Sequence, residues 1–303
     1  MTGVTKNTET LLLDGSMGRE LRMRGVEIPE TIWSANALLA APDVVVDIHT
    51  DNILAGAGVI TTNSYGIIRS DLAKVGLQDR FAALNEKACE LALEARTRSG
   101  HSEVKIAGSM PPLRGSYRAD LVGTFEEIYP LYQEQASLLA PHVDIILCET
   151  MSSAEEARAA ATAACEFGKP VWVAWTLHEN KMGLLRSGER VELAFEAIQD
   201  LPVDGFFANC CPPESIEAVM PLLSSLPGDY CGGYANTFMP IPEEWTLDGE
   251  GEDDGLLALR DDLDAQTYAD FALRWVKAGA NTVGGCCGTS PAYIAEIQRR
   301  LQH

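Results

Sequence analysis

Two pairs of adjacent cysteines are the residues of this sequence best suited to do chemistry. Cys210 and Cys211 form one pair, and Cys286 and Cys287 lie between glycines in residues 284–288. Thiolates are soft ligands that suit zinc, with Zn–S distances near ~2.3 Å. Three protein sulfurs and one open position are the layout of a catalytic zinc that takes a thiol substrate as its last ligand. The cysteines therefore predict a zinc site.

The two pairs differ in the backbone that surrounds them. Side chains alternate along a strand, so Cys210 and Cys211 should face opposite sides, and only one of them can reach a shared site. The glycines that flank Cys286 and Cys287 have a freedom in φ and ψ that permits a bend, which would bring both sulfurs to one metal. We expect three converging sulfurs rather than four.

The composition predicts a soluble, unexported protein with a large core. Of its 303 residues, 46% are hydrophobic, yet the chain has no apolar run of membrane-spanning length and no signal-peptide pattern. The 44 acidic residues outnumber the 23 basic ones and give a formal charge of −21. Such a charge repels phosphate backbones and anionic lipid, so nucleic-acid and membrane binding are not expected. Eight cysteines without dense, regular spacing are typical of reduced thiols, which indicates a cytoplasmic protein.

Short apolar runs alternate with longer helical patterns along the chain. The runs are continuous, as in residues 143–147, which suits parallel strands buried on both faces. The expected strands are residues 10–15, 59–65, 104–110, 143–150, 171–177, 205–211, 229–236 and 281–288. Eight strand-then-helix units predict an α/β fold of the (β/α)8 TIM-barrel type. A doubly wound sheet is the alternative, but no glycine-rich phosphate loop follows the first strand.

Helices and loops are expected between these strands. Helical spacing covers residues 35–55 and 77–98. Paired start signals precede three later helices, and these are Thr124 with Glu127, Ser153 with Glu156, and Ser290 with Pro291. Residues 239–264 hold prolines and a run of acids, which predicts an exposed loop insertion, either a lid or a plain insertion. Without an interdomain linker, residues 1–303 are expected to form one domain.

Polar residues and cysteines stand at the predicted carboxyl ends of the strands, where barrel enzymes place their chemistry. They are Asp14, Asn63, Ser109, Glu149, Cys210, Asn236, Cys286 and Cys287. One strand separates the sixth strand from the eighth around the ring, so the sulfurs at their ends can converge. The fold and the cysteine chemistry thus indicate the same site independently.

Several blocks of this sequence match the pattern of a known family. They are Asp-Gly-Ser-Met-Gly at 14–18, residues 32–35 and 57–65, Glu149-Thr150 with Glu155-Glu156, Asn209-Cys210, and Gly-Gly-Cys-Cys-Gly at 284–288, the most specific. With these blocks the chain resembles the homocysteine S-methyltransferase family over nearly its whole length. The resemblance implies a zinc barrel that methylates homocysteine to methionine. By position, Cys210, Cys286 and Cys287 would be the zinc ligands, and Cys211 would point away.

The resemblance also implies a set of substrate-binding residues. The expected set is Asp14, Gly15, Trp33, Asn63, Glu149 and Asn236. Asp14 and Glu149 would hold the amino end of homocysteine, and the backbone near Gly15 would assist. Trp33 would either pack in the core or bind the methyl donor through a cation–π contact.

The methyl donor is expected to be an onium compound, because an uncharged ether or thioether is too poor a leaving group. Betaine-using members have an aromatic residue where this chain has Thr150, which favours S-methylmethionine or another sulfonium over betaine. S-adenosylmethionine and a selenol acceptor remain open. Outside methyl transfer, the alternatives are a zinc hydrolase and a cysteine-ligated iron–sulfur or redox-sensing protein. Hydrolase sites usually need histidine and carboxylate ligands, and the five histidines form no paired motif.

Overall fold

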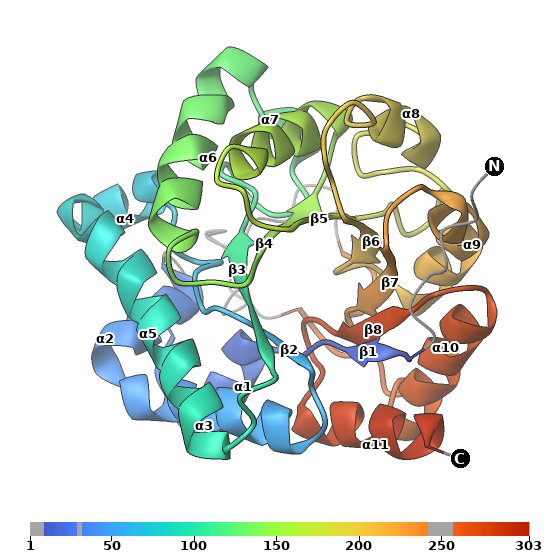
Figure 1. Cartoon of the computed structure of the whole chain (residues 1–303), viewed down its shortest axis with the longest axis horizontal. Helices are drawn as coiled ribbons and strands as arrows, with labels where there is room; N and C mark the ends of the chain where they lie inside the picture. The colour runs from blue at the N-terminus through green and yellow to red at the C-terminus, as the bar shows by residue number, and fades with distance from the viewer. Residues whose placement is uncertain (1–8, 29–31, 242–256, 303) are drawn as a thin grey trace.

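A ring of eight parallel strands forms the centre of the described molecule, and helices surround it (Figure 1). The computed structural model describes residues 9–28, 32–241 and 257–302. The strands are β1 (Leu11–Leu12), β2 (Val59–Thr61), β3 (Lys105–Met110), β4 (Ile145–Met151), β5 (Val171–Trp175), β6 (Gly205–Asn209), β7 (Tyr230–Ala235) and β8 (Thr282–Gly285). Their order is β1-β8-β7-β6-β5-β4-β3-β2. A parallel bridge between Leu13 and Val59 joins β1 to β2 and closes the ring. The predicted (β/α)8 barrel is confirmed.

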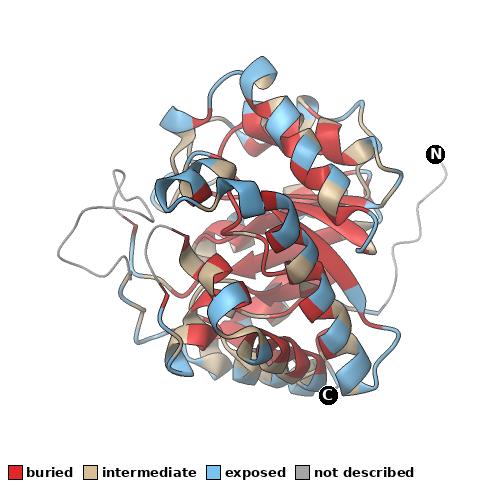
Figure 2. Cartoon of the chain, turned by 90° about the vertical axis from the view of Figure 1, so that its left-hand side faces the viewer, coloured by how far each residue is buried: buried red, intermediate tan, exposed pale blue. Residues whose placement is uncertain are grey.

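The helices pack against the outside of this ring and expose their outer faces, whereas the strands are mostly buried (Figure 2). They are α1 (Met17–Met23), α2 (Ala37–Ala40), α3 (Pro42–Leu54), α4 (Arg69–Lys74), α5 (Phe81–Ser99), α6 (Phe125–Leu139), α7 (Ala154–Cys165), α8 (Val191–Glu196), α9 (Pro213–Ser225), α10 (Ala265–Lys277) and α11 (Pro291–Leu301). Three 3-10 turns are η1 (Trp33–Asn36), η2 (Gln78–Arg80) and η3 (Ala119–Leu121). None of the helices described is both long and apolar enough to cross a membrane.

The apolar side chains of the strands fill two cores. Inside the ring, Trp172 and Phe207 pack together with ring centroids 5.0 Å apart and planes tilted by 41°, and Leu13 and Leu147 belong to the same core. Alternate strand residues, such as Val173, point outward into the larger core beneath the helices. Because both faces are buried, the strands read as continuous apolar runs. Each large side chain that is fully buried contributes about 1.5–3 kcal/mol.

Several strands end earlier than their apolar runs. The hydrogen-bonded ladder of β2 ends at Thr61, that of β6 at Asn209 and that of β8 at Gly285, whereas the predicted strands continued to residues 65, 211 and 288. The residues beyond the ladder are still buried or half-buried, and most of them line a pocket, whereas Cys211 packs in the core beneath the helices. Burial therefore continues where regular pairing has stopped.

The helix expected over residues 35–55 is wrong as a single element. The structure has η1, α2 and α3 in its place, with a break at Ala41, whose φ is −150° and ψ is 53°. Pro42 follows this residue, and a proline disfavours the helical conformation in the residue before it. Pro42 then starts α3 at a position where its missing N–H costs no hydrogen bond. Similarly, the helix expected from residue 77 begins with η2 and becomes α-helical at Phe81.

The predicted helix starts are confirmed with two differences. Thr124 opens α6 with a complete capping box. Ser153 accepts a hydrogen bond from the Glu156 N–H at the start of α7, but the Glu156 carboxylate turns to the N–H and hydroxyl of Ser152. Ser290 occupies the N-cap position of α11 without a capping hydrogen bond from its side chain. These differences leave the starts of the helices where the sequence predicted them.

The insertion expected at residues 239–264 lies partly outside the described residues, which lack 242–256. Its two described ends run side by side, because Phe238 forms an antiparallel bridge with Leu259. The Met239 N–H donates to Ala258 O at 2.8 Å, and the Arg260 N–H donates to Thr237 O at 2.8 Å. The base of the insertion is thus a short ladder that begins directly after β7.

Candidate metal centre and substrate pocket

A pocket opens at the carboxyl ends of the strands and contains most of the predicted site residues. Its lining includes Asp14, Gly15, Trp33, Asn63, Tyr117, Glu149, Cys210, Tyr234, Cys286 and Cys287. Asn236 is the predicted site residue that does not line it. The pocket therefore brings together side chains from the ends of β1, β2, β4, β6, β7 and β8, as the barrel topology predicted.

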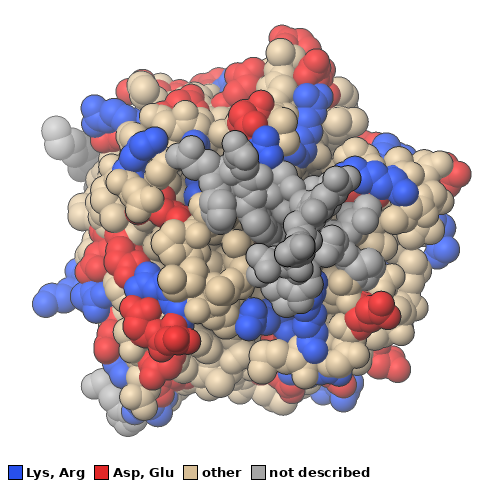
Figure 3. Space-filling model, turned by 180° about the vertical axis from the view of Figure 1, so that it is seen from behind, with Lys and Arg blue, Asp and Glu red and all other residues tan. Residues whose placement is uncertain are grey.

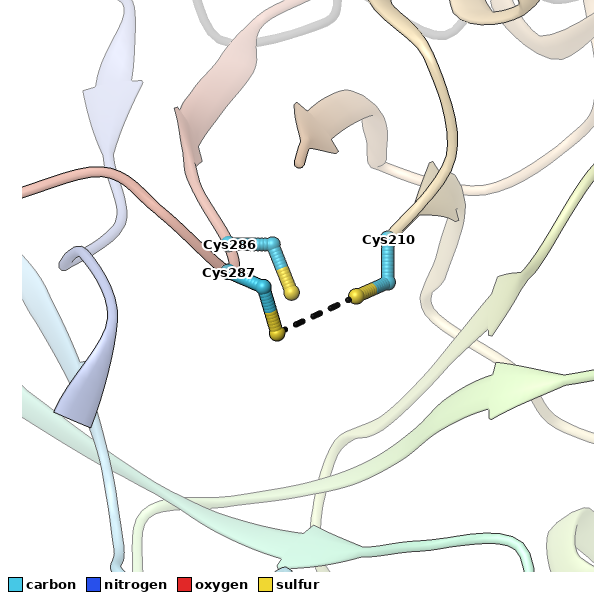
Figure 4. Close-up of side chains that lie close together, drawn as sticks. All are labelled: Cys210, Cys286 and Cys287. Atoms are coloured by element: carbon cyan, nitrogen blue, oxygen red, sulfur yellow. Dashed lines mark hydrogen bonds between the residues drawn. The ribbon is translucent and has the colours of Figure 1, made fainter. Parts of the chain in front are cut away.

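Three cysteine sulfurs meet in this pocket. The Sγ atoms of Cys210, Cys286 and Cys287 all lie within 4.8 Å of one another. Figure 4 shows the three side chains pointing toward one another, with Cys210 after β6 and the other two after β8. The Cys210 and Cys287 sulfurs are 3.5 Å apart. Within the described residues, no other group of three histidine, cysteine or acidic side chains is close enough to hold a metal.

The intervening strand β7 positions both sides of this cluster. The Cys210 N–H donates to Tyr234 O at 3.0 Å, and the Cys286 N–H donates to Ala235 O at 2.9 Å. Tyr234 and Ala235 are consecutive residues of β7, so its last two peptide groups fix the two segments that carry sulfur. Thr237, just beyond β7, adds a bond from its N–H to Cys287 O at 2.9 Å. The spacing of the cysteines is thus set by backbone hydrogen bonds.

The glycines around Cys286 and Cys287 serve a purpose that differs in part from the prediction. Only Gly288 has a left-handed backbone, with φ of +87°, and so allows the predicted bend. At Gly284 a Cβ would lie 2.5 Å from the Leu13 Cβ, and at Gly285 it would lie 2.2 Å from the Thr289 hydroxyl. Two of the three glycines therefore permit close packing of the chain rather than unusual dihedral angles.

Cys210 and Cys211 do face different surroundings, but strand alternation is not the reason. β6 ends at Asn209, and Cys210 adopts a left-handed conformation with φ of +48°. Its sulfur packs with Tyr117 and Ile241 at the pocket, whereas Cys211 is fully buried in the core beneath the helices. A left-handed turn at Cys210, rather than the pleat of a strand, separates the two side chains.

The three thiols shift one another's pKa values in opposite directions, because hydrogen bonds within the cluster lower the pKa of Cys210 and raise those of Cys286 and Cys287. Hydrogen bonds from Cys286, Cys287 and Tyr117 hold the pKa of the Cys210 thiol well below its usual value. The Tyr117 hydroxyl lies 2.9 Å from the Cys210 sulfur. Thiolate is the form that binds metal, so one of the three sulfurs is already prepared for coordination. A set of three sulfurs fits zinc or another soft metal and leaves one position of a tetrahedral site to a substrate.

Two buried carboxyl groups lie in the same pocket. Asp14 accepts hydrogen bonds from the Thr61 N–H at 2.8 Å and the Thr61 hydroxyl at 3.1 Å. Glu149 accepts from the Ser109 hydroxyl at 2.5 Å and from the Tyr234 hydroxyl at 3.3 Å. Both carboxyl groups are 7% exposed. These bonds fix each group and leave lone pairs free for a ligand.

Burial dominates the electrostatics of these two groups. Desolvation raises the pKa of Asp14 to about 7 and that of Glu149 to about 7, against the opposing hydrogen bonds. Repulsion from Asp14 adds to the effect on Glu149. A cationic ligand between them would favour ionisation of both and restore their usual pKa values. The pair is therefore suited to bind an ammonium group.

Trp33 lies in the pocket with its ring already in contact with one cation. The Arg22 guanidinium is 5.1 Å from the ring centroid. A Cβ at Gly18 would lie 2.6 Å from the indole nitrogen, so this glycine lets α1 pack against the ring. Asn63 donates to Ser34 O at 2.9 Å and thereby ties the turn that carries Trp33 to the end of β2. Binding of a donor cation to Trp33 remains a prediction.

Gly15 and Asn236 are placed differently from what their proposed roles suggest. The Gly15 N–H is occupied by a 3.0 Å hydrogen bond to the Asn52 side chain, so it has no proton left for a substrate. Asn236 is 1% exposed, and its Oδ1 accepts from the Phe238 N–H at 3.3 Å. It shapes the turn into the insertion instead of lining the pocket. Substrate-binding roles for both residues remain untested expectations.

Other side chains at the site were not in the predicted set. Tyr234 and Thr61 fix the two carboxyl groups, and Tyr117 contacts Cys210. Arg19, on α1, also lines the pocket. Tyr234 lies near the carboxyl end of β7, so its place at a strand end could have indicated it. Tyr117 follows the stretch 108–112, from which the sequence already predicted that it would shape the donor pocket, whereas Arg19 comes from a helix, where the sequence gives no such signal.

Comparison with known proteins agrees with this geometry. A family model for homocysteine S-methyltransferases matches residues 11–301. The chain belongs to the homocysteine S-methyltransferase family. The family resemblance expected from the sequence is therefore confirmed, and it is a family of methyltransferases.

Individual relatives in this family match almost the whole chain. A homocysteine S-methyltransferase of Escherichia coli is 27% identical over 310 residues, covering 96% of this chain and 95% of the relative. A selenocysteine Se-methyltransferase of Brassica oleracea is 28% identical, covering 96% and 88%. In three dimensions, the metallated form of the E. coli homocysteine methyltransferase MmuM aligns with a TM-score of 0.80 at 27% identity, covering 97% of each chain.

Proposed function

We propose that this protein transfers a methyl group from an onium donor to the thiol of homocysteine in a zinc-dependent reaction and forms methionine. The observation that supports it best is the convergence of the Cys210, Cys286 and Cys287 sulfurs within 4.8 Å of one another, in a pocket that also contains Asp14 and Glu149. A soft metal site and an ammonium site in one cavity match a substrate that carries both a thiol and an amino group.

The three cysteines would hold the zinc ion. A bound zinc would supply Lewis-acid activation, keeping the substrate thiol deprotonated at neutral pH, where a free thiol with pKa near ~8.5 is only a few per cent ionised. Tyr117 would support Cys210 through the 2.9 Å contact of its hydroxyl. The backbone bonds from β7 would keep the sulfurs in place before any metal arrives.

Asp14 and Glu149 would bind the ammonium group of homocysteine. Their carboxyl groups come from the ends of β1 and β4, and Thr61, Ser109 and Tyr234 fix their orientation. Holding the amino end in this way would aim the sulfur at the methyl carbon of the donor, and such positioning supplies much of the rate in a displacement. The new S–CH₃ bond forms as the methyl–onium bond breaks, and the donor leaves uncharged.

The donor would be a sulfonium such as S-methylmethionine. Thr150, which stands where betaine-using relatives have an aromatic residue, is fully buried and does not line the pocket. Its place therefore contributes no aromatic face to a cage for betaine. Betaine and S-adenosylmethionine remain alternative donors. A selenol acceptor is a further alternative, because one relative is a selenocysteine Se-methyltransferase.

The test combines metal analysis with a methyl-transfer assay. The purified protein should contain about one zinc per chain, and it should form methionine from homocysteine with at least one sulfonium donor. Chelation should remove the activity and added zinc should restore it. Full activity in rigorously metal-free protein would contradict the zinc requirement. A metal-containing protein that transfers no methyl group from any of a panel of onium compounds would contradict the enzymatic function.

A further inference from the structure

Arg19 is an unusual residue in this pocket because it carries a positive charge. Among the described lining residues it is the only lysine or arginine. It lies on α1, one residue after the glycine that packs against Trp33, and its side chain is half-buried. The same pocket holds Asp14 and Glu149, so the cavity contains groups of both charges.

The guanidinium of Arg19 has no hydrogen-bond or ion-pair partner among the described residues. Elsewhere the arginines of this acidic protein are mostly paired, as Arg24 is with Glu20 and Asp51, and Arg260 with Glu214 and Asp262. Figure 3 shows the same interleaving of acidic and basic groups on one face of the molecule. Arg19 is close enough to the Tyr293 phenol to act on it electrostatically, but a neutral phenol does not neutralise the charge.

We propose that Arg19 binds a carboxylate of the methyl donor and so selects zwitterionic onium compounds over simple cations. This inference rests on the function proposed above. An unpaired arginine repels a donor that carries only a positive charge, whereas a donor with its own carboxylate replaces this repulsion by a charge-assisted hydrogen bond. Arginine suits this purpose because its planar guanidinium can bind a carboxylate through two parallel bonds.

Burial assigns this contact to the donor rather than to homocysteine. Asp14 and Glu149 are 7% exposed, so the ammonium that they are proposed to bind would be buried. The carboxylate of homocysteine is on the same carbon atom as that ammonium and therefore stays at the same depth. Arg19 is half-buried and thus more exposed than the two acids, so we assign it to the second substrate. The cavity then places Asp14 and Glu149 near the ammonium group of homocysteine and Arg19 near the carboxylate of the donor.

The experiment compares donors that differ only in the carboxylate. The probes are 3-(dimethylsulfonio)propionate and its amide, together with S-methylmethionine and its amide. The zinc-loaded wild-type protein should bind each acid about 10- to 100-fold more tightly than its amide, as measured by calorimetry without homocysteine. Binding is measured without turnover, so this result does not depend on whether the protein catalyses methyl transfer.

Substitution of Arg19 should remove the preference. Arg19→Gln should weaken binding of the acids to the level of the amides and raise the donor KM by the same factor, while the KM for homocysteine is unchanged. Arg19→Lys keeps the charge and should keep part of the preference. Arg190→Gln, at an exposed arginine paired with Glu192 outside this pocket, is the matched control and should behave as wild type.

Three results would overturn the proposal. Equal affinities of the wild type for the acid and the amide would show that the pocket does not recognise the carboxylate. A preference that survives in Arg19→Gln would place its origin elsewhere. A rise in the KM for homocysteine instead of the donor KM would assign the contact to the acceptor. If the wild type shows the binding preference but transfers no methyl group, the methyltransferase function fails and the assignment of Arg19 to zwitterionic onium ligands stands.

Discussion

The Asn209 side chain is joined to Thr150 by two hydrogen bonds that connect the ends of β4 and β6. Asn209 Oδ1 accepts from the Thr150 N–H at 2.8 Å, and its Nδ2 donates to the Thr150 hydroxyl at 3.0 Å. The neighbours of these two residues are Glu149 and Cys210. One amide group therefore sets the position of the proposed ammonium site relative to the proposed metal site. Thr150 needs this support because its φ is +64°, a conformation that is strained for a β-branched residue.

Replacement of Asn209 should therefore damage both sites at once. Asn209→Ala leaves the buried Thr150 N–H without a partner, and we expect a loss of about 2–4 kcal/mol in the free energy of unfolding. Zinc affinity and the KM for homocysteine should both worsen. Thr150→Gly is the control, since glycine accepts the positive φ and keeps the N–H bond, and it should cost less. Denaturant unfolding and zinc titration measure these effects. Normal zinc affinity in a destabilised Asn209→Ala protein would show that Asn209 stabilises the fold but does not position the metal site.

The cysteine pairs provide a second prediction. Cys210→Ala, Cys286→Ala and Cys287→Ala should each abolish zinc retention and methyl transfer, because two sulfurs cannot complete the site. Cys211→Ala should retain zinc and activity, with only the packing loss of a small buried side chain. Metal analysis after gel filtration distinguishes these outcomes. Zinc loss in Cys211→Ala together with zinc retention in Cys210→Ala would reverse the assignment within the pair.

Glu149 should matter for substrate affinity more than for folding. Glu149→Ala removes a charged partner of the ammonium group, and we expect the KM for homocysteine to rise roughly 10- to 100-fold. The isosteric Glu149→Gln should show a similar rise. Glu156→Gln is a matched control, because Glu156 is also buried and also has a pKa of about 7 but does not line the pocket. Its KM should stay at the wild-type value. Steady-state kinetics that do not change in Glu149→Gln would assign Glu149 to structure.

Ligand binding should also depend on pH. Asp14 and Glu149 have pKa values of about 7 in the empty site, so their carboxylates form as pH rises through this value. Methionine, the proposed product, has the ammonium group but no thiol, and its affinity should increase between about pH 6 and pH 8. Calorimetry across this range measures the change, which should be reduced in Glu149→Gln. An affinity for methionine that is constant over this range would contradict the role of the two acids.

His49 on α3 should make the fold sensitive to acid. Its ring is fully buried without a hydrogen bond, and burial lowers its pKa to about 4 from 6.5. Between these values the unfolded chain binds a proton that the folded protein does not, so the stability contribution present above pH 6.5 is lost as pH falls. By pH 4 the loss should reach about 3 kcal/mol. The difference in unfolding free energy between wild type and His49→Leu, measured at pH 7 and pH 4, isolates this effect. A constant difference would contradict it.

The sequence predicted the barrel and the three sulfurs because both depend on regular patterns. Continuous apolar runs indicate parallel strands, and strand order then places residues at the ends of β6 and β8 near each other. The local geometry of the site depends on individual tertiary contacts, which the spacing of residues along the sequence does not indicate. Gly284 and Gly285 were expected to bend the chain, but they allow close approach to Leu13 and Thr289.

Other features were missed because their causes are tertiary. Arg19 reaches the pocket from α1, outside the strands, so the strand-end rule did not select it. The bond from Asn52 to Gly15 could not be foreseen, because it joins α3 to the loop after β1. The break at Ala41, in contrast, was readable from Pro42 and should have been part of the prediction.

Two consecutive peptide groups of β7 accept hydrogen bonds from Cys210 and Cys286. The cysteine site is therefore held by the backbone of the barrel itself. In small zinc domains the free energy of metal binding drives the folding of the chain, so removal of the metal unfolds these domains. Here the backbone hydrogen bonds of β7 already space the sulfurs, so the binding energy of a metal ion could appear fully as affinity. If the site binds zinc as proposed, the ion could then exchange in the native state. The protein would then gain stability from zinc only by mass action, in proportion to the logarithm of free zinc once the site is saturated.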